Sequence, residues 1–128
     1  MSFKSAKLLI ATIGLGLGSA AIAEDLVYLY TEGSGMVWYY DAGTIRRYPN
    51  NVVEVWMAAD ASSDKTVSFR ALRNKFRIDC SSETLGVLHV YHYRADGTSM
   101  KSQKFEYPQM MPFIPDTLSE TMLRKMCA

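Results

Sequence analysis

The stretch from Leu72 to Cys80, Leu-Arg-Asn-Lys-Phe-Arg-Ile-Asp-Cys, decides how this chain folds. In an extended chain one face carries Leu72, Phe76, Ile78 and Cys80, and the other carries Arg73, Lys75, Arg77 and Asp79. This period of two predicts a strand that is buried on one side only. The strand ends in one of only two cysteines, and the second, Cys127, is the penultimate residue.

The N-terminus has the pattern of a secretory signal peptide. Lys4 and Lys7 precede the apolar run Leu8–Gly18, and Ala21-Ile22-Ala23 is a small-x-small cleavage site. We therefore predict a leader over residues 1–23, cleavage between Ala23 and Glu24, and a single domain over residues 24–128. The alternative is an uncleaved anchor, although the apolar run is shorter than the ~20 residues of a membrane span.

Composition narrows the class of protein. The whole chain has a formal net charge of +1, and two of its basic residues lie in the leader. A nearly neutral domain has no general attraction for nucleic acid. We expect the chain to meet a membrane only through its export signal.

Two cysteines in an exported chain predict one disulfide, Cys80–Cys127. Two free thiols or an intermolecular bridge are the alternatives.

Five further stretches have the composition of strands. They are Leu26–Thr31, Val37–Tyr40, Asn51–Ala59, Thr84–Arg94 and Thr98–Tyr107. Turn signals separate them, including Asp41-Ala42-Gly43-Thr44, Pro49-Asn50-Asn51 and the hairpin dipeptide Asp96-Gly97. Short connections favour antiparallel pairing, because parallel strands need long crossovers. With the strand within Val67–Cys80, the pattern predicts a six-stranded antiparallel sheet.

The C-terminal part of the chain changes character. Pro108, Pro112 and Pro115 predict an extended arm without regular ladder bonds. Thr117-Leu118-Ser119-Glu120 then matches a capping box, in which each end side chain accepts from the other residue's free amide. After it, apolar residues recur at helical spacing: Leu118, Met122, Leu123, Met126 and Cys127. We predict a helix to the chain end that docks on the sheet, an α+β fold.

The order of these pieces resembles the surface-adhesin protein E family of Gram-negative bacteria. The resemblance rests on short motifs in order: Val37-Trp38-Tyr39-Tyr40-Asp41, Thr44-Ile45-Arg46-Arg47, Asn51-Val52-Val53-Glu54-Val55-Trp56, Phe76-Arg77-Ile78-Asp79-Cys80, Asp96-Gly97, Ile114-Pro115-Asp116 and the terminal Cys127. It implies a six-stranded antiparallel sheet with a C-terminal helix held on one face by the disulfide. For the best-known member it also implies attachment to host extracellular-matrix proteins.

No residue pattern indicates an enzyme. His89 and His92 are three residues apart in a predicted strand, which places them on opposite faces and away from a shared metal. The chain has no nucleophile-elbow, phosphate-loop or dinucleotide motif. We therefore expect no catalytic residues, no metal site and no cofactor.

Two surface features remain as binding candidates. The chain has a basic run of Lys65, Arg70, Arg73, Lys75 and Arg77, and we expect the last three to share one sheet face. Such a stripe fits acidic protein segments or sulfated or phosphorylated glycans, or is simply a solvated face. The chain is also rich in Trp and Tyr, which fits a contact patch, a homodimer surface or cross-strand packing.

These observations predict an exported, non-enzymatic binding module of the periplasm or outer cell surface. Its partner would be a host extracellular-matrix protein or another macromolecule, contacted by Arg73, Lys75, Arg77 and Trp56. The alternative is a periplasmic structural or small-ligand-binding protein that never meets a host.

Overall fold

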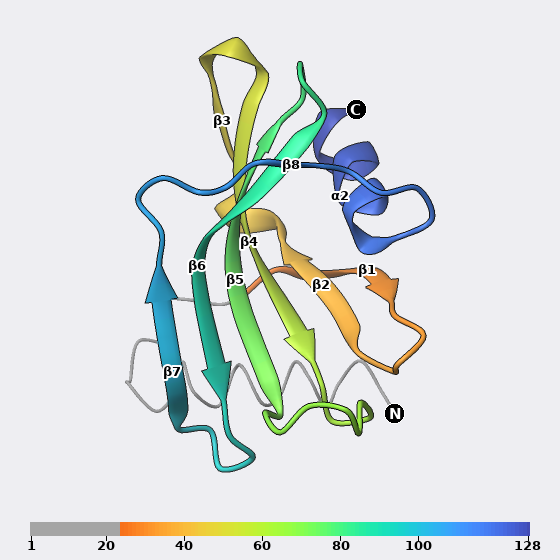
Figure 1. Ribbon diagram of the computed structural model, residues 1–128, viewed down its shortest axis with the longest axis vertical. Coiled ribbons are helices and arrows are strands. Elements are labelled where there is room, and N and C mark those ends of the chain that lie inside the picture. The colour runs from red at the N-terminus through yellow and green to blue at the C-terminus, as the bar shows by residue number, and fades with distance from the viewer. Residues whose placement is uncertain (1–23) are drawn as a thin grey trace.

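The computed structural model describes residues 24–128, which form one antiparallel sheet with a helix on one face (Figure 1). Six long strands follow one another across the sheet: β1 (Leu26–Thr31), β2 (Val37–Asp41), β4 (Val52–Asp60), β5 (Ala71–Asp79), β6 (Thr84–Tyr93) and β7 (Ser99–Lys104). All neighbours pair antiparallel. The predicted sheet is confirmed, and β5, the strand with the alternating sequence, lies in its interior.

Two short strands that the sequence pattern does not predict extend the sheet. β3 (Arg46–Tyr48) pairs with the first residues of β4, in the register Arg47 opposite Val53. β8 (Met111–Pro112) pairs with the first residues of β6, in the register Met111 opposite Leu85. The proline-rich arm is therefore not free of ladder pairing, and the prediction was wrong on this point.

Single-turn 3-10 helices flank β3 on both sides. η1 (Ala42–Thr44) follows Asp41, whose carboxylate accepts a hydrogen bond from the Gly43 amide at 3.2 Å. This is the side-chain turn that the sequence predicts at Asp41. In η2 (Pro49–Asn51), Asn50 has φ 68°, in the left-handed region that asparagine adopts more readily than most residues.

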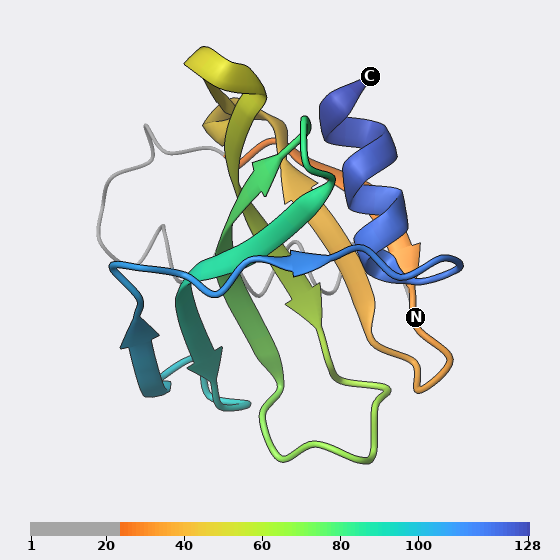
Figure 2. The same cartoon turned by 45° about the horizontal axis from the view of Figure 1, so that its top comes forward.

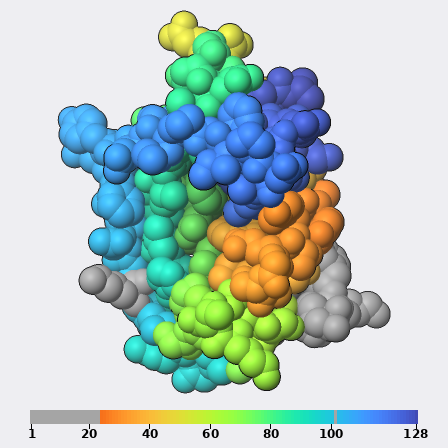
Figure 3. Space-filling model, turned by 45° about the vertical axis from the view of Figure 1, so that its right-hand side comes forward, coloured from red at the N-terminus to blue at the C-terminus, as the bar shows by residue number. Residues whose placement is uncertain are grey.

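The core lies on the face that α2 (Leu118–Cys127) covers, which we call the helix face. Alternate residues of the central strands point into it: Val53, Val55, Met57, Ala59, Leu72, Phe76 and Ile78, all buried. The helix contributes Met122, Leu123 and Met126, also buried. In Figure 3 the helix and the segment before it lie directly on the β1–β2 hairpin.

The intervening residues of the same strands point away from the helix. We call this side the far face and define it by Glu54, Trp56, Arg73, Lys75, Arg77, His89, Tyr91 and Lys104. Arg73, Lys75 and Arg77 lie on it together with Trp56, as the alternation predicts. A smaller apolar cluster of Leu26, Tyr39 and Ala58 lies on this side, under β1 and β2.

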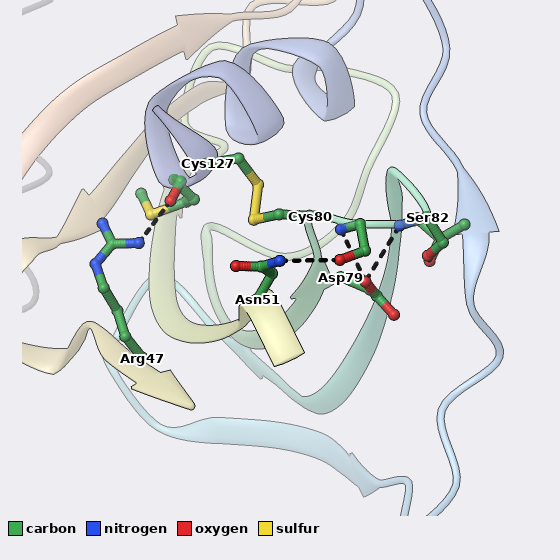
Figure 4. The surroundings of a disulfide bond; sticks show 9 residues. Arg47, Asn51, Asp79, Cys80, Ser82 and Cys127 are labelled. Atoms are coloured by element: carbon green, nitrogen blue, oxygen red, sulfur yellow. Dashed lines mark hydrogen bonds between the residues drawn. A yellow bond between two sulfur atoms is a disulfide. The ribbon is translucent and has the colours of Figure 1, made fainter. Parts of the chain in front are cut away.

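A disulfide between Cys80 and Cys127 ties the helix to the end of β5 (Figure 4). The S–S distance is 2.07 Å and the bridge joins residues 47 positions apart. Close to it, the Arg47 guanidinium donates to the Met126 carbonyl at 2.8 Å and satisfies one of the last helical acceptors. The predicted C-terminal tether is confirmed.

The start of α2 differs from the predicted capping box. Thr117 is the N-cap, but its hydroxyl donates to the Ile114 carbonyl at 2.6 Å and accepts no hydrogen bond from a backbone amide of the helix. Glu120 instead accepts from the Asp116 amide at 2.7 Å. The reciprocal pair is lost because the preceding turn, in which Asp116 has φ 61°, presents a different amide to the carboxylate.

Between β7 and the helix, residues 105–117 cross the sheet and reach α2 (Figures 1 and 2). Gly86 of β6 makes room for this crossing segment. A Cβ atom placed there would lie 2.9 Å from the Gln109 carbonyl oxygen and 2.9 Å from the Met110 sulfur.

The predicted leader and the cleavage-site residue Ala23 lie outside the described residues. Glu24 is the first residue that the structure describes, and its carboxylate forms an ion pair with Arg73 of β5. Within residues 24–128, no helix has the length and the apolar content to cross a membrane.

Candidate binding face

A row of four side chains runs straight across the far face. Trp56 lies opposite Lys75, Lys75 opposite His89, and His89 opposite Lys104, on strands β4, β5, β6 and β7. Rings and cations therefore alternate along a line perpendicular to the strands. Neighbouring strands lie about 4.8 Å apart, so the two lysines of the row are separated by roughly 10 Å of sheet.

Glu54 lies beside this row and neutralises part of its charge. The carboxylate accepts from Arg77 Nε at 2.9 Å and lies 3.5 Å from Lys75 Nζ. Glu54 is only 8% exposed, whereas the Arg77 side chain is 38% exposed. The basic stripe predicted from the sequence is thus assembled but partly paired, because Glu54 of the adjacent strand lies opposite Arg77.

Arg73 is held more tightly than the other predicted contact residues. Its guanidinium forms an ion pair with Glu24, and a second nitrogen lies 3.8 Å from the Asp41 carboxylate. Burial raises the pKa of the Glu24 carboxyl group. The charge of the adjacent Arg73 lowers this pKa again, but only in part. Arg73 therefore serves the packing of residue 24 against the sheet, and is less available than Lys75 or Arg77.

The aromatic residues divide between the two faces. On the far face Trp56 stacks on Tyr91, with ring centroids 5.9 Å apart and an interplanar angle of 26°, and Trp56 lies 5.4 Å from the His89 ring. Trp38 instead packs edge-on against Phe76 in the core. Only the first group forms a surface patch, and it coincides with the row of cations.

A hollow of about 500 Å³ opens at the end of the row. It is lined by Glu54, Lys75, Arg77, Leu88, His89, Lys104, Phe105 and Glu106. Lys104 has no ion-pair partner within the described chain, and the Arg77 terminal nitrogens make no hydrogen bond there. The basic side chains of the hollow therefore retain the capacity to bind an anion.

His89 lies at the centre of this arrangement, although the sequence pattern indicates only that it and His92 lie on opposite faces of a strand. Burial, and then the charges of Lys104 and Lys75, lower the pKa of its imidazole. Its Nδ1 atom is buried without a hydrogen-bond partner among residues 24–128. The only sequence signal for its role was the alternation that places it on the far face, because its neighbours come from other strands.

The histidines do not meet. His92 lies opposite Leu72 on the helix face and packs against Phe69 at a centroid distance of 4.4 Å, while His89 lies opposite Lys75. Among residues 24–128 no three metal-ligating side chains gather at one place.

The structure is a single antiparallel sheet with one covering helix and a charged, ring-bearing opposite face. The same fold occurs in two solved structures of Haemophilus influenzae protein E. One has a TM-score of 0.59 and 14% identity, and covers 80% of this chain and 87% of that chain. The other has a TM-score of 0.56 and 13% identity, and covers 80% and 83%. At this identity the likeness concerns the fold.

The family is given by the sequence itself. The model of the family described as surface-adhesin protein E matches residues 27–128. The chain therefore belongs to the surface-adhesin protein E family, as the resemblance implied. No curated protein matches the sequence at a significant level.

Proposed function

We propose that this protein is an exported, non-enzymatic adhesin that displays its far face at the cell surface and binds a host macromolecule there. The observation that carries the proposal is the Trp56–Lys75–His89–Lys104 row beside a hollow in which Lys104 has no ion-pair partner among residues 24–128. Membership in an adhesin family supports it. The helix face is filled by α2, so the far face is the broad surface that remains for a partner.

A charge-neutralising pair of substitutions tests the proposal. Lys75→Gln with Lys104→Gln removes two cations of the row, while Lys65→Gln with Lys125→Gln removes two exposed lysines elsewhere and is the matched control. We expect binding to immobilised extracellular-matrix proteins to fall at least tenfold for the first pair only. Equal losses, or no loss, would remove the far face from the function.

The structure also explains why the arginines are poor test positions. Arg77→Glu would place a second carboxylate against the buried Glu54, and Arg73→Glu would do the same near Asp41. Both variants would lose stability through like-charge repulsion. A loss of binding would then have two explanations, whereas Lys104 has no partner to lose within the described chain.

Surface display is a separate part of the proposal. An antibody against the folded domain is expected to label intact cells. Labelling only after the outer membrane has been opened would instead place the protein in the periplasm, as a structural or small-ligand-binding domain.

A further inference from the structure

The row and the hollow together restrict the chemistry of a ligand. Strands β4, β5 and β6 are paired on both sides, so their backbone amides and carbonyls are used in the sheet. A ligand that lies over Trp56, Lys75 and His89 meets side chains alone. A peptide that binds by adding a strand would have to use an edge strand, β1, β3, β7 or β8, and would not lie over Trp56, Lys75 and His89.

The rings provide a platform for a flat apolar surface. Trp56 and Tyr91 stack nearly parallel, at an interplanar angle of 26°, and are neither fully buried nor fully exposed. Partly exposed aromatic faces of this kind accept the C–H face of a pyranose ring, and their polar edges stay hydrated. A polyglutamate chain carries no equivalent ring surface.

The cations lie at intervals that suit a polymer with regularly repeated anions. Lys75 and Lys104 are two strands apart, about 10 Å. Arg77 is hydrogen-bonded to Glu54 through Nε, and its terminal nitrogens make no hydrogen bond within residues 24–128. A planar guanidinium edge binds a carboxylate or a sulfate through two parallel hydrogen bonds.

His89 lies between the two lysines of the row and has one ring nitrogen without a partner. Its Nδ1 atom is buried and makes no hydrogen bond within residues 24–128. Buried polar atoms in folded proteins nearly always have a partner. Because this atom lies below the accessible surface, an oxygen of a ligand in the hollow reaches it only if the His89 ring turns toward the hollow.

We propose that the far face binds an acidic polysaccharide. Pyranose rings would lie on Trp56 and Tyr91, and a carboxylate or sulfate group would enter the hollow between Lys75, Arg77 and Lys104. The inference rests on the proposed function and names the ligand class of the same face. The volume of the hollow, about 500 Å³, is that of a site for a small ligand or a sugar unit.

The test uses the folded exported chain and three defined probes: a heparin-derived hexasaccharide, a hyaluronan hexasaccharide and polyglutamate. Calorimetric titration is expected to show binding of one or both oligosaccharides and at least tenfold weaker binding of polyglutamate. Hyaluronan carries carboxylates alone, so its comparison with heparin tells which anion the hollow prefers. Tighter binding of polyglutamate would overturn the proposal in favour of an acidic peptide.

Two variants separate the parts of the site. Lys75→Gln with Lys104→Gln is expected to weaken oligosaccharide binding at least tenfold and to reduce its salt dependence, while Lys65→Gln with Lys125→Gln changes it less than twofold. Trp56→Leu is expected to weaken binding at least fivefold even at high salt, where charge attraction is screened. Thermal melting shows whether each variant is folded.

The outcomes also distinguish this inference from the proposed function. If no oligosaccharide binds, yet matrix-protein binding is lost in the Lys75→Gln, Lys104→Gln variant, the adhesin function stands and the polysaccharide is wrong. If the binding of the oligosaccharides and the binding of matrix proteins are both unchanged by the loss of the two lysines, both proposals fail. Equal effects of the two lysine pairs would show general charge attraction and would overturn the inference.

Discussion

Glu54 shows at the scale of single residues how the far face is charged. Its carboxylate is nearly buried, and burial of a charge is unfavourable unless partners compensate it. Arg77 and Lys75 supply that compensation while their own side chains remain partly exposed. Glu54 therefore fixes the positions of two cations and, at the same time, lowers the net positive charge of the hollow.

Replacing Glu54 by glutamine should affect stability and binding in opposite directions. Glu54→Gln keeps an acceptor for Arg77 and removes the negative charge, so we expect a loss of about 1 kcal/mol in the free energy of unfolding. Anion binding should become tighter because both cations are released. Urea denaturation and titration with the heparin hexasaccharide measure the two effects. Weaker anion binding by this variant would contradict the assignment of Glu54.

His89 gives the far face a dependence on pH. Its folded-state pKa is lowered by burial and by Lys104 and Lys75, so near pH 6.5 the unfolded chain binds more protons than the folded chain. Stability is therefore lost as the pH falls from about 7 through the unfolded-state value and on to the lower folded-state value.

Removal of the imidazole should remove that part of the pH dependence. We expect His89→Gln to lose less stability than the wild type between pH 7.5 and pH 5, measured by urea denaturation at each pH. The same loss of stability in His89→Gln and wild type would show that other groups cause the acid sensitivity.

At the scale of elements, the C-terminal helix depends on its tether. A helix of ten residues is marginal by itself, and its stability comes from docking Met122, Leu123 and Met126. The disulfide closes a loop with a sequence separation of 47, which stabilises the fold by about 4 kcal/mol in the chain-entropy model.

Loss of the disulfide should therefore be costly. We expect Cys127→Ala to lower the melting temperature by more than about 10 °C, at ~4–8 °C per kcal/mol for a domain of this size. The double variant Cys80→Ala with Cys127→Ala should melt close to the single variant, which rules out an effect of the free thiol. A shift of only a degree or two would contradict the role of the tether.

The crossing segment depends on the absence of a side chain at Gly86. A Cβ atom there would meet the Gln109 carbonyl oxygen, which belongs to the backbone and has little freedom to move. We expect Gly86→Ala to lower the free energy of unfolding by about 1–3 kcal/mol. Gly33→Ala, where a Cβ meets nothing within 4 Å, should change it by less than about 0.5 kcal/mol. Equal effects in urea denaturation would contradict the close packing.

Much of the element plan could be predicted, because the signals are local. The alternation in Leu72–Cys80 fixed the faces of β5, and β1 has the predicted limits. The strands β3 and β8 could not be predicted, because each is held by a partner strand and not by its own composition. The capping box failed because the turn at Asp116 is decided by contacts outside the motif.

The whole molecule shows why the site was only half predictable. The shared face of Arg73, Lys75 and Arg77 follows from alternation within one strand, and Trp56 joins it through the register of β4 with β5. That these residues contact a partner stays a prediction. The position of His89 and Lys104 beside Lys75 depends on the register of three strands and on the irregularity between Lys75 and Phe76. The register between strands is set by packing across the sheet, so the sequence did not predict that His89 and Lys104 lie beside Lys75.

The central claim is that the far face, and not the helix face, receives the ligand. The chain has two tryptophans, one on each side: Trp56 lies in the row, and Trp38 is buried in the core, where its indole N–H donates to Glu32 at 2.5 Å. Their two indole N–H signals in a ¹⁵N-resolved NMR spectrum can be assigned with Trp56→Phe. On titration with the heparin-derived hexasaccharide, the account predicts that the Trp56 signal shifts and the Trp38 signal stays in place. A shift of Trp38 alone, or no shift of either signal, would contradict it.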